Sequence, residues 1–246
     1  IAEAVSTLFC ITYTYLYIDR IKYGLNHLTN FDFKLLERIL GISCFTMVQY
    51  FLSMATWFVF FMAIERLGQR ELAIANIIRS IYIVLLIPVQ ALSTTANTLV
   101  SNLIGAGGIN HVMKLMNRIS KVSIIIVLIC IGILLIKPQF FLSVYTNEPQ
   151  LVSGSIPSLY IICVAMFLAA VSNIYFNGIS GTGNTQAALF LETGILIIYA
   201  IYVLWIGLWV KAPVYICFTA EILYYVFMLF ASVIYLKKAK WQNKRI

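Results

Sequence analysis

Long apolar runs alternate with short polar segments along the whole chain. A membrane-spanning helix needs about 20 largely apolar residues, and seven runs approach or exceed that length. They cover residues 1–18, 41–64, 72–104, 119–136, 158–178, 186–209 and 213–236. The third run is too long for one untilted span, and Pro88 within it predicts a kink. The pattern predicts an all-α polytopic membrane protein with about seven transmembrane helices.

The segment between the first two runs, residues 19–40, has a different pattern. Phe33, Leu35, Leu36 and Ile39 alternate there with charged residues, which is typical of a short interfacial helix. A plain loop fits the segment nearly as well. The chain begins inside an apolar run and lacks the basic residues that open a signal peptide. We therefore interpret it as part of a longer protein.

The composition supports the membrane class. Hydrophobic residues make up 62% of the 246 positions and charged residues only 11%, whereas soluble domains carry about 25% charged residues. This disfavours a soluble enzyme or nucleic-acid-binding domain. The five cysteines lie within apolar runs and form no CxxC motif, so neither a disulfide framework nor a metal site is predicted. We expect no metal and no cofactor.

The formal net charge of +8 comes from residues at the ends of the apolar runs, so it does not indicate a nucleic-acid partner. Twelve of the 17 Lys and Arg residues fall on one side of the predicted topology and four on the other. The positive-inside rule then predicts a cytoplasmic C-terminus in a cell membrane, inner or plasma. Four tryptophans are predicted interface anchors: Trp57, Trp205, Trp209 and Trp241.

Polar residues within the third run share a spacing of four, three and four. They are Gln90, Thr94, Asn97 and Ser101. This spacing places them on one face of a helix. They could form hydrogen bonds between helices or line a water-filled cavity. Asn173 and Asn177 likewise lie one turn apart, near the end of the fifth run.

Three ionisable residues lie inside the later runs: Arg79, Glu192 and Glu221. Ionisable residues at such positions are candidate functional groups, and either glutamate could be a proton site. The alternative is that each side chain reaches or pairs near a membrane interface. Glu192 lies near the cytoplasmic end of its predicted span and Glu221 near the outer end of its own. We therefore expect the two glutamates not to face each other directly.

Enzyme motifs are missing from the sequence. His27 and His111 lie in separate loops, and neither HExxH nor GxSxG occurs. We therefore predict that the protein is not an enzyme.

Three short motifs in a fixed order resemble one transporter family. Arg66-Leu67-Gly68 precedes Leu72-Ala73 where one span ends and the next begins. Leu99-Val100-Ser101-Asn102, followed by Gly105-Ala106-Gly107, ends that next span. Gly181-Thr182-Gly183-Asn184-Thr185 lies between the fifth and sixth runs. This order and spacing resemble the multidrug and toxic compound extrusion (MATE) transporters.

The resemblance implies twelve helices in two six-helix lobes. Residues 1–18 would then be the last helix of the N-terminal lobe and residues 19–40 a cytoplasmic interlobe linker. Residues 41–236 would be the complete C-terminal lobe and residues 237–246 a basic cytoplasmic tail. The same resemblance implies a substrate cavity between the lobes. Its wall in this lobe would comprise Gln49, Ser53, Gln90, Thr94, Asn97, Ser101 and Asn173.

One departure from the family concerns charge. Many members carry an acid in helix seven, and some in helix ten, but residues 41–64 and 158–178 contain no Asp or Glu. Ser53 falls where the helix-seven acid is expected. We therefore expect this lobe to lack the usual charge, so that coupling rests on the N-terminal lobe, with Glu192, Glu221 and Arg79 as weaker candidates.

The function implied is a Na⁺- or H⁺-coupled antiporter that exports small organic compounds or drugs by alternating access. Its partners would be a small-molecule substrate, the bilayer and the N-terminal lobe, in a monomer. A flippase for a lipid-linked substrate is the alternative within the superfamily. A seven-helix receptor is a remote alternative. Such a receptor would usually carry an Asp/Glu-Arg-Tyr motif at the cytoplasmic end of its third span, but the third run here ends in Asn102-Leu103-Ile104-Gly105.

Overall fold

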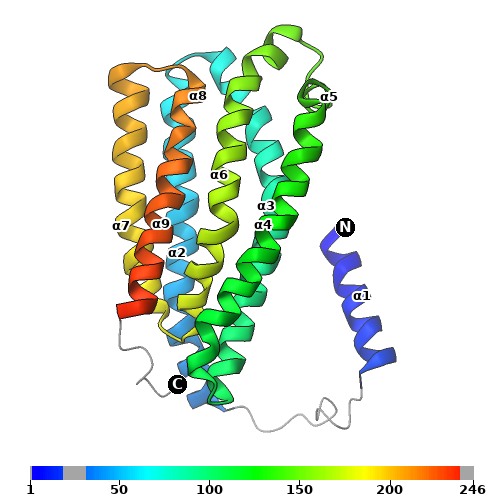
Figure 1. Ribbon diagram of the computed structural model, residues 1–246, viewed down its shortest axis with the longest axis vertical. Helices are drawn as coiled ribbons and strands as arrows, with labels where there is room; N and C mark the ends of the chain where they lie inside the picture. The colour runs from blue at the N-terminus through cyan, green and yellow to red at the C-terminus, as the bar shows by residue number, and fades with distance from the viewer. Residues whose placement is uncertain (1, 19–31, 239–246) are drawn as a thin grey trace. The chain divides into compact units, whose positions relative to one another are not determined.

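The computed structural model describes residues 2–18 and 32–238, and every regular element in these ranges is helical. The chain divides into two compact units, residues 1–40 and 41–246. Helix α1 lies in the first unit, and α2 runs from the first into the second (Figure 1). The elements are α1 (Ala2–Tyr17), α2 (Phe33–Glu65), α3 (Gln69–Gly105), η1 (Ile109–His111), α4 (Val112–Ile136), α5 (Pro138–Ser143), α6 (Pro149–Gly181), α7 (Thr185–Leu204), the π-helix η2 (Trp205–Val210), α8 (Val214–Cys217) and α9 (Thr219–Lys238).

Six helical segments in the described residues are long and apolar enough to cross a membrane. They correspond to the second to seventh predicted spans, and the first predicted span forms the 16-residue helix α1. The all-α, multi-pass fold class is thereby confirmed. Helix α3 continues through Pro88, and α6 starts at Pro149, well before the expected start of its span.

Helix α2 starts at Phe33, eight residues before the predicted start of its span. Asp32 explains this start, because its side-chain oxygen accepts hydrogen bonds from the backbone N–H groups of Lys34 and Leu35 at 2.9 and 3.2 Å. Residues 33–40 of the expected linker are therefore helical. The rest of that linker, residues 19–31, and the tail from residue 239 onward lie outside the described residues.

Helix α6 is central to the second unit. It packs against α3, α4 and α9 and has the most buried membrane-spanning window of the six. Small side chains allow this close packing: Ala165, Ala169 and Ala170 are fully buried. A Cβ atom at Gly181 would lie 2.7 Å from the backbone oxygen of Asn97, so only glycine permits this approach of α6 to α3.

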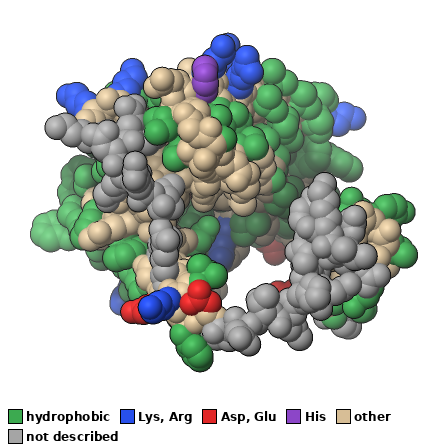
Figure 2. All heavy atoms as spheres, turned by 90° about the horizontal axis from the view of Figure 1, so that it is seen from below, with side chains coloured by type: hydrophobic (Ala, Val, Ile, Leu, Met, Phe, Trp, Pro, Cys, Tyr) green, Lys and Arg blue, Asp and Glu red, His purple; other side chains and the backbone are tan. Residues whose placement is uncertain are grey.

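The glycine-rich motifs form the turns at one end of the unit. Gly107 and Gly183, which follow α3 and α6, have φ values of 79° and 78°, a conformation that favours glycine. Basic side chains gather at the same end, at the start of α4 and the end of α9 (Figure 2). Arg66, Arg70, Lys137 and Lys211 lie at the opposite helix ends. The charge asymmetry of the sequence thus becomes a difference between the two ends of the bundle.

Candidate functional site

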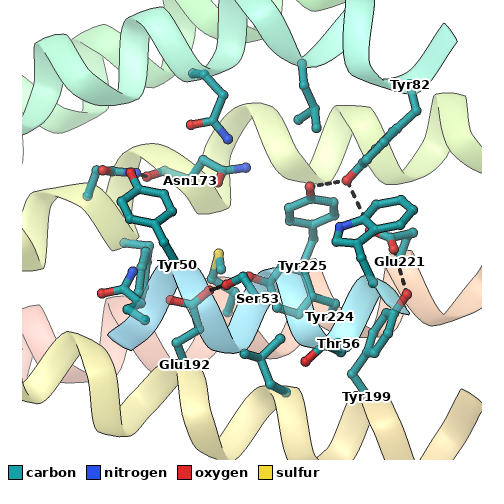
Figure 3. Close-up of a pocket in the computed structure, with 18 residues that line it drawn as sticks. Tyr50, Ser53, Thr56, Tyr82, Asn173, Glu192, Tyr199, Glu221, Tyr224 and Tyr225 are labelled. Atoms are coloured by element: carbon teal, nitrogen blue, oxygen red, sulfur yellow. Dashed lines mark hydrogen bonds between the residues drawn. The ribbon is translucent and has the colours of Figure 1, made fainter. Parts of the chain in front are cut away.

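A cavity of about 240 Å³ lies within the bundle, bounded by α2, α3, α6, α7 and α9 (Figure 3). Tyrosines, amides and two carboxylates make its wall unusually polar for a membrane-spanning bundle. Its polar and aromatic lining residues are Gln49, Tyr50, Ser53, Thr56, Trp57, Tyr82, Gln90, Asn173, Phe176, Asn177, Glu192, Tyr199, Glu221, Tyr224 and Tyr225. Tyr50 and Gln90 are exposed, whereas both glutamates are buried. The exposed pair marks the mouth, between α2 and α3.

Glu192 is held by hydroxyl groups from two other helices. Its side chain is 4% exposed, and Oε1 accepts hydrogen bonds from Ser53 Oγ at 2.6 Å and from the Tyr224 hydroxyl at 3.2 Å. Its other oxygen, Oε2, has no hydrogen-bond partner among the described residues, and neither has the buried Oε1 of Gln49. Two acceptor oxygens in this part of the cavity therefore lack a donor.

Glu221 has a fuller set of partners. It is 3% exposed, and its two oxygens accept hydrogen bonds from the hydroxyls of Tyr199 at 2.9 Å and Tyr82 at 3.0 Å. The Tyr82 hydroxyl is also hydrogen-bonded to that of Tyr225. Three tyrosines from α3, α7 and α9 thus surround this carboxylate, and each carboxylate oxygen has a donor.

Helical spacing explains why these residues converge. On α9, Glu221 is followed at three and four residues by Tyr224 and Tyr225, which places all three on one face. On α7, Glu192 and Tyr199 are seven residues apart, which is about two turns. Each helix therefore presents one acid and at least one tyrosine to the same cavity.

The chemistry of the cavity suits a small cation. Among its lining residues there is no Lys, Arg or His, so no protein cation balances the carboxylates. An unpaired buried carboxylate is costly and is stabilised by a proton or a bound cation. Carboxylate, amide and hydroxyl oxygens are suitable ligands for hard cations. The described residues contain no cluster of three or more His, Cys, Asp or Glu side chains for a transition metal.

The structure divides the seven residues assigned to the substrate cavity into two groups. Gln49, Ser53, Gln90 and Asn173 line this cavity. The remaining three do not, because α3 continues beyond it. Thr94 is exposed and Asn97 packs against Gly181. Ser101 Oγ donates a hydrogen bond of 2.9 Å to the backbone oxygen of Gly181.

The structure adds contacts to two expectations about the acids. Neither Glu192 nor Glu221 extends into solvent, because both are buried and bonded to other side chains. That coupling rests on the N-terminal lobe stays a prediction. Ser53 lies on α2, and α7 brings the carboxylate of Glu192 to within hydrogen-bonding distance of it. The two acids also line one cavity, although no hydrogen bond joins them directly.

The tyrosines of the cavity were not recognised from the sequence. Their signal is the helical spacing of Tyr224 and Tyr225 from Glu221, but aromatic residues also occur at membrane interfaces, which hides it. Trp57, expected as an interface anchor, lines the cavity instead. Arg79 lies outside the cavity, with its guanidinium over the rings of Trp57 and Phe61, at 5.7 and 5.0 Å from their centroids.

Comparison with known proteins identifies the family. The fold is similar to that of a MOP superfamily transporter from Pyrococcus furiosus Vc1 (DSM3638), whose binding pocket of reverse polarity suggests a different function. The TM-score is 0.68 at 14% identity, over 85% of this chain and 46% of the other, so the chain spans about half the length of that transporter. No curated protein sequence matches the chain. The MatE family model matches residues 45–206, and the chain belongs to this family, that of the multidrug and toxic compound extrusion transporters.

Proposed function

We propose that this chain forms the C-terminal lobe of a cation-coupled antiporter that exports small organic compounds by alternating access. In this proposal the cavity between α2, α3, α6, α7 and α9 binds the coupling cation, H⁺ or Na⁺. The observation that carries it is the pair of buried carboxylates, Glu192 and Glu221, in a cavity that holds no protein cation. Residues 2–17 would be the last helix of the N-terminal lobe.

The hydrogen-bond partners of Glu192 support a site that binds and releases the coupling cation. Glu221 has a tyrosine donor on each oxygen, so neither of its oxygens needs a further hydrogen-bond donor. Glu192 has donors on Oε1 only, and its Oε2 and the Oε1 of Gln49 need a further partner. A proton on Glu192, or a sodium ion near Glu192 Oε2 and Gln49 Oε1, supplies this further partner. We therefore assign the exchangeable cation to Glu192.

The position of the cavity links cation binding to substrate binding. Its mouth between Tyr50 and Gln90 opens on the exposed face of α3. In transporters built from repeated lobes, substrates bind between the lobes near the middle of the membrane. A cation at Glu192 and a substrate at the mouth would share the helices α2 and α3. Binding of one can then change the affinity for the other, which antiport requires.

The experiment uses the complete protein in proteoliposomes with an imposed H⁺ or Na⁺ gradient. Ethidium, an organic cation, and a fluorescent alkyl sulfonate, an organic anion, are the transport probes. We expect one of the two gradients to accelerate export of a probe and Glu192→Gln to abolish that acceleration. Glu148→Gln, at the exposed start of α6, is the control and should behave as wild type. Gradient-driven export that persists in both Glu192→Gln and Glu221→Gln would refute the proposal.

A further inference from the structure

Arg79 is a cation beside the cavity that has no anionic partner among the residues that the structure describes. It lies on α3, three residues before Tyr82, and is exposed. Its guanidinium lies over Trp57 and Phe61 of α2. Among the described residues it forms no ion pair and donates no hydrogen bond. A charged group at membrane depth normally has a partner, so this arginine has unused binding capacity.

The aromatic contact leaves the binding edge of the guanidinium free. A guanidinium that stacks on aromatic rings uses its flat face and keeps its N–H groups for hydrogen bonds in its own plane. Such an edge matches the two oxygens of a carboxylate, sulfonate or phosphate. Trp57 contacts Arg79 on one side and lines the cavity on the other. Arg79 therefore lies beside the cavity, along the seam between α2 and α3.

The same face of α3 has a polar–apolar–polar pattern. At 100° per residue, Arg79 and Gln90 point in directions only about 20° apart, and about 16 Å separates them along the axis. Between them on this face are Ile83, which is 49% exposed, and Leu86, which lines the cavity. Gln90 is exposed at the cavity mouth. The face thus offers a positive charge, an apolar stretch and an amide, in that order.

No acid offsets the charge of Arg79 along this seam. The described part of α2 contains no Asp or Glu between residues 41 and 64, and α3 contains none after Glu71. The carboxylates of the cavity are buried and bonded to hydroxyl groups. An organic cation would therefore meet a positive charge on this face, whereas an organic anion would meet a complementary one.

We propose that Arg79 binds the anionic group of an amphiphilic organic substrate, whose apolar body lies over Ile83 and Leu86 towards Gln90. This inference rests on the proposed function only in taking the exposed face of α3 as the substrate side. It adds the substrate class, an organic anion with an extended apolar body. In this arrangement the carboxylates of the cavity bind the coupling cation, and Arg79 binds the anionic group of the substrate.

The test is equilibrium binding to the complete protein in nanodiscs of a zwitterionic lipid. The probe is an alkyl sulfonate with a fluorescent group at its far end, and its matched partner has a trimethylammonium group in place of the sulfonate. We expect the sulfonate to bind more tightly than the ammonium compound. Arg79→Gln should weaken sulfonate binding at least tenfold, as expected for loss of a charged hydrogen-bonding partner. Arg79→Lys should retain part of the affinity, because it keeps the charge but loses the planar edge.

Arg70→Gln is the matched control. Arg70 lies nine residues earlier on α3, on the opposite face of the helix, and its replacement removes the same charge. Sulfonate binding should be unchanged in this variant. A second arm adds phosphatidylglycerol to the nanodiscs, which distinguishes a substrate site from a lipid-headgroup site. If the anionic lipid abolishes sulfonate binding, or if Arg79→Gln binds the sulfonate as wild type does, the inference is wrong.

This test can refute the substrate class without refuting the proposed function, and the reverse. It measures equilibrium binding without a gradient and compares variants that all keep Glu192, so its outcome does not depend on gradient-driven export. If gradient-driven export requires Glu192 but the sulfonate binds independently of Arg79, the transport proposal survives and the substrate class is refuted. If Arg79 binds the sulfonate but no gradient drives export, the substrate class survives and coupling is refuted.

Discussion

Ser53 Oγ donates a hydrogen bond of 2.6 Å to Glu192 Oε1, which joins α2 to α7 across 139 positions of the sequence. The resemblance to the MATE family places an acid at the position of Ser53. In this protein that position has a hydroxyl, and α7 supplies the carboxylate. A carboxylate of a neighbouring helix thus lies next to the position at which the resemblance implies an acid. The following predictions test this arrangement.

The Ser53–Glu192 hydrogen bond should influence the affinity of the site for the coupling cation. Ser53→Ala removes one donor of a buried carboxylate, a change worth about 1.5–3 kcal/mol for a hydrogen bond to a charged group. We expect the affinity for the coupling cation to change by about tenfold or more, measured as proton uptake or ²²Na⁺ binding. Thr95→Ala is the control, because its exposed hydroxyl bonds only to Ala91 O of its own helix. Equal affinities in the two variants would show that the bond has no role in cation binding.

Exchanging the side chains of Ser53 and Glu192 tests whether a carboxylate on α2 can replace the one on α7. Glu192→Ser should abolish cation binding, and adding Ser53→Asp should restore part of it, because the acid then lies on α2 opposite a hydroxyl on α7. Cation binding by the double variant is the measurement. No recovery, in a variant that inserts and melts as wild type does, would count against the positional equivalence of the two residues.

Gln49 should contribute to the cation site. Its Oε1 and the Oε2 of Glu192 are buried acceptors without a donor, and a proton or cation shared with them would satisfy both. Gln49→Leu removes one acceptor, so the cation affinity should fall several-fold. Gln139→Leu, in the exposed helix α5, is the control and should keep wild-type affinity. A Gln49→Leu variant with undiminished affinity would exclude this oxygen from the site.

The stability of the protein should depend on the tyrosine hydroxyls that donate hydrogen bonds to Glu221. Tyr199→Phe leaves Oε1 of Glu221 without its donor, at a cost of about 1–3 kcal/mol for an unsatisfied buried group. A lower melting temperature of the protein in detergent is expected. Tyr160→Phe removes the hydroxyl of an exposed tyrosine on α6 and should leave the melting temperature unchanged. Similar melting of both variants would contradict a stabilising role for the Tyr199 hydroxyl.

The approach of α6 to α3 should require a glycine at position 181. A methyl group there would lie 2.7 Å from the backbone oxygen of Asn97, and overpacking of this kind costs about 1–3 kcal/mol. Gly181→Ala should therefore lower the melting temperature. Gly132→Ala on α4 meets no atom within 4 Å and should be neutral or slightly stabilising. If the two variants melt alike, the backbone contact is less tight than the structure indicates.

The sequence predicted the helices well because apolar run length is a local property. It predicted the helix ends less well, since Asp32 caps α2 and α6 extends to Pro149, and both ends depend on individual residues beyond the apolar run. The spacing within the third run identified Gln90 as a candidate residue, and Glu192 and Glu221 were identified as acids inside apolar runs. Ser53 was a candidate through the family resemblance alone.

The contacts between helices could not be predicted in this way. Spacing tells which residues share a face of one helix, but not which face of another helix lies opposite. Ser53 and Glu192 were both recognised, yet their hydrogen bond follows from the packing of α2 near α7. The same holds for Tyr82, which reaches Glu221 from α3. Asn97 and Ser101 lie on the expected face of α3, but the end of α6 packs against them.

The central claim is that Glu192 exchanges the coupling cation against substrate. The most direct measurement is the number of protons or sodium ions that the complete protein releases when the alkyl sulfonate binds in the absence of a gradient. Wild type should release about one cation per bound sulfonate, and Glu192→Gln should bind the sulfonate and release none. An equal release from Glu192→Gln and wild type would contradict the account.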